Sequence, residues 1–272
     1  GADDPDTVQA KVSDWATFNA TAAEMKEAGY KMTATTNDTF RTYSNNVTTP
    51  WVVDGKIQID DNLKAWVDAS KEMADNGYCG TQGLWSDDWS KGFYPEGKVF
   101  CYFGPAWFVN FSMAADTEGS IGYNGGWGAA QGPQGFFWGG TWLLANKDTQ
   151  KKEAVKDILE WITLDSSEEG LQYMWANGTY NGEGGTKDCV ASGTVMSKSD
   201  GSVDFLGGQN MFDVFVPANS YAKGTNLTQY DETINTYWRE QVREYTAGNK
   251  SREQAIADFK QQVADNLDVI VE

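Results

Sequence analysis

Large aromatic side chains flank a pair of glycines in the run FFWGGTWLLA, residues 136–145. Trp138 precedes Gly139 and Gly140, and Trp142 follows two residues later. Glycine has no side chain, so the backbone can bend there or approach another group closely. Rings beside such a bend can stack on a flat, partly polar molecule. A buried aromatic cluster at a strand end explains the same residues equally well.

Aromatic residues also flank acidic ones in the run WSDDW, where Trp85 and Trp89 enclose Asp87 and Asp88. A ring next to an acid can bind hydroxyl groups, but either aspartate can equally well be a helix N-cap. Glycoside hydrolysis would need two carboxylates about 5–10 Å apart on opposite sides of the substrate. Adjacent aspartates are poorly placed for such opposing roles.

Composition removes several classes of function. The 272 residues include no histidine, which excludes Ser-His-Asp and Cys-His catalysis and histidine-ligated metals. Lys and Arg number 21 against 39 acids, giving a net charge of −18, which disfavours nucleic acid and anionic membranes as partners. Cys79, Cys101 and Cys189 show no CxxC spacing and allow at most one disulfide. The sequence does not decide whether Cys79 and Cys101 form it. We expect no metal and no cofactor.

Hydrophobic periodicity and turn residues predict helices mixed with a few short strands, which indicates α/β layers. The predicted helices span residues 15–28, 61–76, 151–164, 229–246 and 251–267, with a short helix after Pro105 and strands at 30–35 and 98–103. Asp165 or Ser166 is expected to cap a further helix that ends at Asn177. An apolar, strand-like run follows Trp142.

Four tryptophans on the apolar stripes of predicted helices are assigned to core packing: Trp15, Trp66, Trp161 and Trp175. The chain has no apolar run of the ~18 residues that span a membrane. Its first residues have neither the basic nor the apolar region of a signal peptide. They are typical of the middle of a longer protein.

Several motifs occur in a fixed order: DDPDTVQAKVSDWATF, LWSDDWSKGF, VFCYFGPAWF, GYNGGWGAAQGPQGFFWGGTWLLANKD, KKEAVKDILEWIT and FLGGQNMFDVF. This order resembles that of the carbohydrate-binding proteins of ABC transporters, the family 1 extracellular solute-binding proteins that include maltose-binding protein. The resemblance covers nearly the whole chain and is greatest to forms from Gram-positive gut bacteria.

The resemblance implies an α/β fold of the type II periplasmic-binding-protein class, helix-rich with a short mixed sheet and an incomplete second lobe. It implies that residues 1–144 form the main part of the C-terminal lobe. Residues 145–190 would be a helical segment that returns to the incomplete N-terminal lobe. Residues 191–272 would complete the C-terminal lobe with its closing helices.

A sugar ring has an apolar C–H face and a rim of hydroxyls, so its site needs aromatic planes and well-placed polar groups. The chain has 12 Trp and 12 Tyr. Trp107, in GPAWF, matches the tryptophan that stacks on sugar in maltose-binding relatives. The other expected contacts are Trp138, Gly140, Trp142, Trp85, Asp87, Asp88, Trp89, Arg41, Asp38 and Tyr180. A solvated loop is the alternative for Asp38 and Arg41.

The resemblance implies a protein without catalysis that binds a carbohydrate of oligosaccharide size and delivers it to an ABC permease. Such a protein would be a monomer, located in the periplasm or at the outer face of the membrane through a lipid anchor outside this chain. A carboxylate-dependent glycoside hydrolase is one alternative. A sugar sensor or adhesion module without a role in transport is the other.

Overall fold

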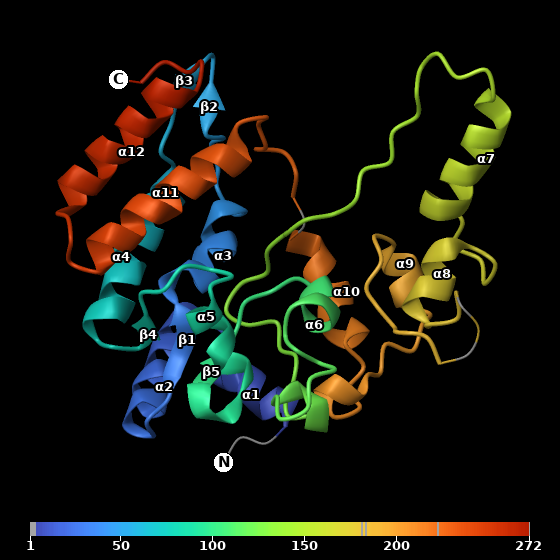
Figure 1. Ribbon diagram of the computed structural model, residues 1–272, viewed down its shortest axis with the longest axis horizontal. Helices are drawn as coiled ribbons and strands as arrows, with labels where there is room; N and C mark the ends of the chain where they lie inside the picture. Colours follow the sequence, from blue (N-terminus) through green and yellow to red (C-terminus); the bar gives the residue numbers. More distant parts are fainter. Residues whose placement is uncertain (1–3, 181, 183, 222, 272) are drawn as a thin grey trace. The chain divides into compact units, whose positions relative to one another are not determined.

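The computed structural model describes residues 4–271 except 181, 183 and 222. The chain divides into two compact units (Figure 1). Unit 1 comprises Gly1–Gln9, Gly104–Gln131 and Trp138–Ser220. Unit 2 comprises Ala10–Phe103, Gly132–Phe137 and Tyr221–Glu272. Each unit is therefore assembled from segments that are far apart in the sequence.

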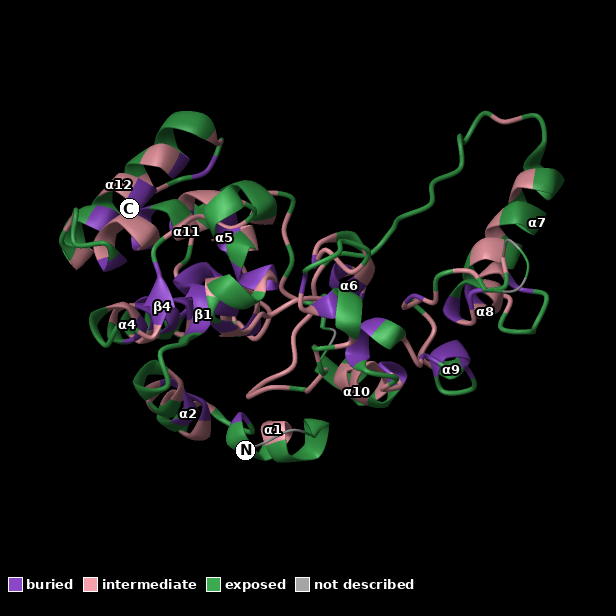
Figure 2. Cartoon of the chain, turned by 60° about the horizontal axis from the view of Figure 1, so that its bottom comes forward, coloured by how far each residue is buried: buried purple, intermediate pink, exposed green. Residues whose placement is uncertain are grey.

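Unit 2 contains a three-stranded parallel sheet in the order β4-β1-β5. Its strands are β1 (Lys31–Thr35), β4 (Cys79–Gly80) and β5 (Val99–Cys101). All of β1 except Lys31 is buried (Figure 2), because a central parallel strand is covered on both faces. The strands predicted at 30–35 and 98–103 are thus confirmed.

The register of this sheet settles the pairing of Cys79 with Cys101. Thr33 of β1 is opposite Cys79 on one side and Cys101 on the other. The two cysteines are therefore two strand spacings apart, about 9.6 Å, beyond the ~7 Å that a disulfide can bridge. Both thiols are free, and burial raises the pKa of Cys79 to about 12.

Helices pack around this sheet and around a short antiparallel hairpin of β2 (Val52–Val53) and β3 (Lys56–Ile57). Asp54 and Gly55 form the hairpin turn with φ of +51° and +75°, the conformation that favours an Asp-Gly pair. The helices of unit 2 are α2 (Trp15–Glu27), α3 (Phe40–Ser44), α4 (Asp61–Asp75), α5 (Asp87–Ser90), α11 (Asp231–Thr246) and α12 (Arg252–Asn266). The four long helices predicted in this part of the chain are confirmed.

The larger core of unit 2 lies among α4, α11 and α12 and is rich in aromatic rings. Phe259 of α12 is fully buried, with its ring 4.8 Å from that of Trp238 and 5.6 Å from that of Trp51. The burial of Phe259 agrees with the hydrophobic periodicity that predicts the helix at 251–267. Because T-shaped and tilted aromatic pairs add to the energy of burial, these rings are central to the stability of unit 2.

Unit 1 contains fewer regular elements. They are α6 (Trp107–Phe111), α7 (Lys152–Thr163), α8 (Leu171–Ala176), α9 (Gly193–Met196) and α10 (Phe212–Ala218), while α1 (Pro5–Lys11) crosses the division between the units. The buried side chains of unit 1 include Phe205, Leu206, Met211 and Phe212.

Three predictions for unit 1 are wrong. The run after Trp142 is not a strand. The helix predicted after Asp165 or Ser166 begins only at Leu171, with Gly170 as its N-cap, because the Asp165 side chain instead accepts a hydrogen bond from the Ser167 amide in a turn. Trp161 and Trp175 are exposed instead of buried in a core.

Among the described residues, no helix combines the length and apolar character needed to cross a membrane.

We predict that Phe259→Ala lowers the free energy of unfolding by about 3–5 kcal/mol, because it leaves a cavity between Trp51 and Trp238. Phe111→Ala is the matched control, since Phe111 is 77% exposed and its loss should cost less than about 0.5 kcal/mol. Urea denaturation followed by tryptophan fluorescence would measure both. Equal effects of the two variants would contradict this account of the core.

Candidate functional site

A buried carboxyl group stands at the carboxyl end of β1, where η1 (Thr36–Thr39) begins. Asp38 is only 2% exposed. Its Oδ1 accepts a hydrogen bond of 2.8 Å from the Trp89 indole, and its Oδ2 accepts one of 2.9 Å from the Thr35 amide. Burial raises the pKa of Asp38 to about 7, although these two hydrogen bonds act to lower it. Asp38 therefore positions Trp89, and its loop is not solvated.

The WSDDW run places its two tryptophans in opposite environments. Trp89 is buried and also packs edge-on against Tyr102, whose hydroxyl donates to the Trp89 carbonyl at 2.8 Å. Trp85 is exposed, with its ring 5.0 Å from that of Trp89. The backbone of Trp85 has φ of +67°. Such a left-handed conformation is costly for a residue with a side chain, and it often occurs at functional sites.

Asp87 and Asp88 are exposed on the first turn of α5. The N-cap of this helix is Ser86, whose hydroxyl accepts from the Trp89 amide at 3.2 Å, so neither aspartate is the cap. Asp88 forms an ion pair with Lys91. Arg41, on α3, is paired at 3.1 Å with Glu232 of α11.

A second aromatic group lies in unit 1. The rings of Trp107, at the start of α6, and Trp138 meet edge-on at 6.0 Å. The Trp107 indole also donates to the Trp138 carbonyl at 3.4 Å. Both side chains are partly exposed. This pair therefore presents aromatic surface while its geometry is fixed by the chain itself.

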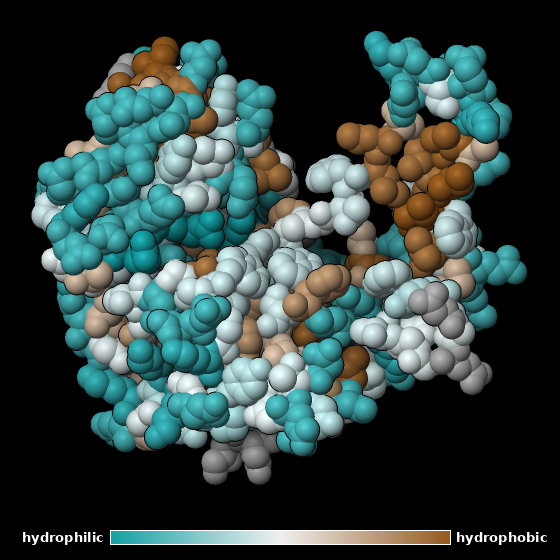
Figure 3. Space-filling model, viewed as in Figure 1, coloured by the Kyte–Doolittle hydropathy of each residue, from teal (hydrophilic) through white to brown (hydrophobic). Residues whose placement is uncertain are grey.

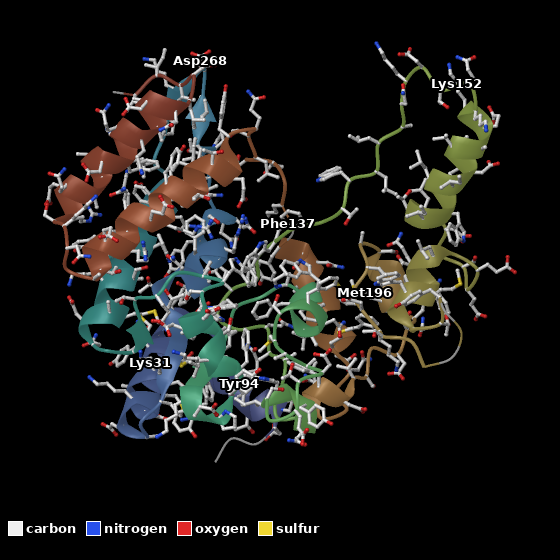
Figure 4. The ribbon with its side chains drawn as sticks, viewed as in Figure 1. Lys31, Tyr94, Phe137, Lys152, Met196 and Asp268 are labelled. Carbon is white, nitrogen blue, oxygen red and sulfur yellow. The ribbon has the colours of Figure 1, made fainter. Side chains whose placement is uncertain are left out.

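The two glycines after Trp138 make this pair possible. Gly139 and Gly140 have φ of +91° and +118°, a region that favours glycine. A Cβ on Gly139 would lie 3.1 Å from Nε1 of Trp107. The predicted bend is present, and the group that approaches Gly139 is the indole of Trp107. Figure 4 labels Phe137, which directly precedes this segment. Trp142 is 85% exposed.

Tyr180 is stacked on Trp175, the tryptophan of α8, with ring centroids 4.4 Å apart and an interplanar angle of 20°. Trp175 is absent from the predicted site residues because its position fits a helical apolar stripe. The sequence signal for this contact is the Asn177-Gly178 pair, which ends α8 and turns the chain. After such a turn, Tyr180 can pack against the helix that precedes it.

The structure thus brings the predicted residues together in separate groups. Asp38, Trp89 and Trp85 form one group in unit 2, with Asp87 and Asp88 beside it. Trp107 and Trp138 form a second in unit 1, followed by Gly140 and Trp142, and Tyr180 belongs to a third with Trp175. No cluster of His, Cys, Asp and Glu suited to a metal ion occurs within the described part of the chain.

Comparison with solved structures identifies the fold. The chain is similar to a family 1 extracellular solute-binding protein, with a TM-score of 0.71 and 19% sequence identity over 96% of this chain and 66% of that one. It is also similar to an ABC transporter-associated binding protein from B. animalis subsp. lactis Bl-04 in complex with β-1,6-galactobiose, with a TM-score of 0.60 and 17% identity over 94% of this chain and 66% of that one.

The resemblance predicted from the sequence is therefore confirmed for the fold: the chain has the fold of extracellular solute-binding proteins. It spans 66% of the length of each of these two structures. Neither the comparison with protein-family models nor that with curated proteins finds a match.

We predict that the protein loses stability as the pH rises from 5 to 8. The pKa of Asp38 is about 7 in the folded protein against an ordinary value of 3.8. The folded state thus binds the proton more tightly, and this stabilisation is complete below pH ~4 and lost as the pH passes ~7. The loss should be on the order of a few kcal/mol. Because the sequence has no histidine, no imidazole titrates in this window.

Melting temperatures at intervals of half a pH unit would measure this dependence. Asp38→Asn should flatten the slope between pH 5 and 8, while Asp87→Asn, which alters an exposed carboxylate, should leave it as in the wild type. A slope that Asp38→Asn does not change would contradict the assignment.

Proposed function

We propose that the protein binds a carbohydrate without converting it, as the solute-binding component of an ABC transporter. The observation that supports this most directly is the Trp107–Trp138 pair, which is partly exposed and fixed by the Gly139–Gly140 bend. Stacking on a C–H face needs such a preformed aromatic surface. The solute-binding fold and the galactobiose in one similar structure support the same class of ligand.

The proposal also covers the size of the ligand, the protein partner and the cellular location. Several separate aromatic surfaces suit an oligosaccharide better than a single sugar ring, because each ring of the ligand needs its own apolar plane. A solute-binding protein acts outside the cytoplasm and delivers its ligand to a membrane permease. We therefore propose a monomer that meets the permease of an ABC transporter there, in the periplasm or bound to the membrane through a lipid anchor.

Glycoside hydrolysis receives less support from the arrangement of the WSDDW run. Asp88 is engaged in an ion pair with Lys91, and both aspartates are exposed on the same turn of α5. Retaining and inverting glycosidases both need two carboxylates that flank the scissile bond. A chromogenic glycoside should therefore remain uncleaved.

We also propose that residues 1–144 and 191–272 form most of a C-terminal lobe. The segment 145–190, although it lies in unit 1 together with residues 104–131, would return to an incomplete N-terminal lobe. The described residues of α7 include none that is buried, and hydrophobic side chains gather on this helix (Figure 3). Leu164 is 74% exposed, and Ile158 and Leu144 are exposed as well.

A hollow of about 350 Å³ beside α7 is lined partly by apolar side chains, among them Val155, Leu159 and Leu164, and partly by charged ones such as Lys152 and Glu160. An apolar face of this kind is usually covered by protein. The similar structures contain additional chain that this one does not match. We propose that a counterpart of that additional chain covers α7.

We predict that Trp107→Ala weakens sugar binding by about 2 kcal/mol, or about 30-fold, because truncation of a central aromatic contact typically costs at least this much. Titration calorimetry with galactose, β-1,6-galactobiose, glucose, maltose and maltotriose would measure it. Trp161→Ala, a tryptophan outside the proposed site, is the control. A bound sugar whose affinity is the same in both variants would remove Trp107 from the site.

We predict that Ile158→Glu changes the stability of the 272-residue chain by less than about 0.5 kcal/mol, since the side chain is exposed. In the protein as its gene encodes it, the same change should cost about 2 kcal/mol or more, because the glutamate would be buried without a partner. Leu227→Glu, at an exposed leucine of unit 2, should be neutral in both. Equal costs of Ile158→Glu in both proteins would contradict the proposed cover.

A further inference from the structure

An asparagine lies beside Trp107 on the outer face of α6. Phe108 and Val109 are buried, whereas Trp107 and Asn110 are both partly exposed. Residues three apart on a helix share one face, with their Cβ atoms about 5–6 Å apart. The Asn110 side chain is therefore a near neighbour of the Trp107 ring, close enough for one ligand ring to contact both.

The segment 187–189 lies along this helix and contacts it at both positions. Nδ2 of Asn110 donates to the Lys187 carbonyl at 2.9 Å, 77 residues away in the sequence. The Trp107 amide donates a hydrogen bond to the Cys189 thiol. All of these residues belong to unit 1. An asparagine on a helix often bonds to its own local backbone, but here its amide is fixed by a distant segment.

Asp188 is a second acceptor that faces the Asn110 amide. It is only 6% exposed. Burial raises the pKa of Asp188, while hydrogen bonds from the Cys189 amide, at 2.7 Å, and from the Asn110 side chain act to lower it. Lys187 pairs instead with Asp200, and within the described part of the chain no cation pairs with Asp188. This carboxyl group therefore depends on uncharged donors, of which Asn110 is one.

These two acceptors determine which way the Asn110 amide faces. A carbonyl and an ionised carboxylate can only accept, so the group that faces them is the NH₂, whose two N–H bonds are both used. The amide oxygen Oδ1 points away from them. It accepts no hydrogen bond from any residue that the structure describes, although such an oxygen can accept two. Asn110 thus holds a fixed acceptor beside Trp107, which lowers the entropic cost of binding a ligand there.

We propose that Asn110 is a ligand-binding residue, whose Oδ1 accepts a hydrogen bond from a hydroxyl of the sugar ring stacked on Trp107. The inference rests on the proposed carbohydrate-binding function and adds a polar contact to it. A ring on the indole directs its C–H face to the aromatic plane and its hydroxyls to the rim, which an acceptor one helical turn away can reach. Asp188 is a positioning residue, since it holds the amide and leaves the contact to Asn110.

Titration calorimetry on Asn110→Ala with galactose, β-1,6-galactobiose, glucose, maltose and maltotriose tests this proposal. We expect its affinity for the sugar that the wild type binds to fall by about tenfold, the effect of one lost hydrogen bond. Asn124→Ala, at an exposed asparagine of the same unit, is the matched control and should change the affinity by less than about twofold. Circular dichroism and melting curves show whether each variant is folded.

Deoxyfluoro analogues of the bound sugar identify the hydroxyl, because fluorine replaces it but cannot donate a hydrogen bond. For one analogue, the wild type should lose about tenfold in affinity. Asn110→Ala should lose less than about twofold for the same analogue, because the contact is already absent.

Variants of Asp188 test its positioning role. Asp188→Ala should weaken binding of the sugar and, like Asn110→Ala, should no longer discriminate against the analogue. Asp188→Asn should retain most of the affinity and the discrimination, because its amide oxygen can still accept from Asn110. Discrimination that persists in a folded Asp188→Ala would remove Asp188 from this role.

If a folded Asn110→Ala binds the sugar as the wild type does, or discriminates against the analogue as strongly, the inference is overturned while the proposed function stands. If Asn110→Ala does not fold, the wild type decides: loss for one analogue supports the contact, and equal affinity for the sugar and all its analogues overturns it. If the wild type binds no sugar in the set, the proposed function fails, and this inference fails with it.

Discussion

The buried carboxyl of Asp38 is the constraint on which the arrangement of unit 2 depends. A carboxyl group removed from water at the end of β1 needs hydrogen-bond donors, and it receives them from the Trp89 indole and the Thr35 amide. The bond to Trp89 connects α5 to η1, 51 residues apart in the sequence. It fixes the end of the central strand and the WSDDW run relative to each other.

This constraint also determines which tryptophan of WSDDW is accessible. Trp89 is buried, because its indole donates to Asp38 and its carbonyl accepts from Tyr102. Trp85 remains at the surface with a left-handed backbone conformation. In unit 1, the Gly139–Gly140 bend has the corresponding effect, since it allows the Trp107 indole to meet Trp138. In both units, a short polar or glycine-rich segment fixes an aromatic pair that is only partly covered.

Much of the fold could be predicted from the sequence, because α2, α4, α11 and α12 bury their apolar stripes within unit 2. The same reasoning fails for α7. Its stripe is as regular as theirs, yet the structure leaves Trp161 and Ile158 exposed. Hydrophobic periodicity indicates that one face of a helix is apolar, whereas the burial of that face depends on which other chain segment covers it.

The amino-acid sequence alone predicts most of the local elements, excludes histidine chemistry, and contains the residue types suited to a sugar. Those properties follow from short-range spacing and side-chain chemistry. Three other features become visible only in the folded chain: Cys79 and Cys101 lie on opposite sides of β1, Asp38 is buried, and the ring of Tyr180 stacks on that of Trp175. Strand order, burial and ring stacking depend on contacts between segments that are separated in the chain, and the spacing of residues carries no information about such contacts.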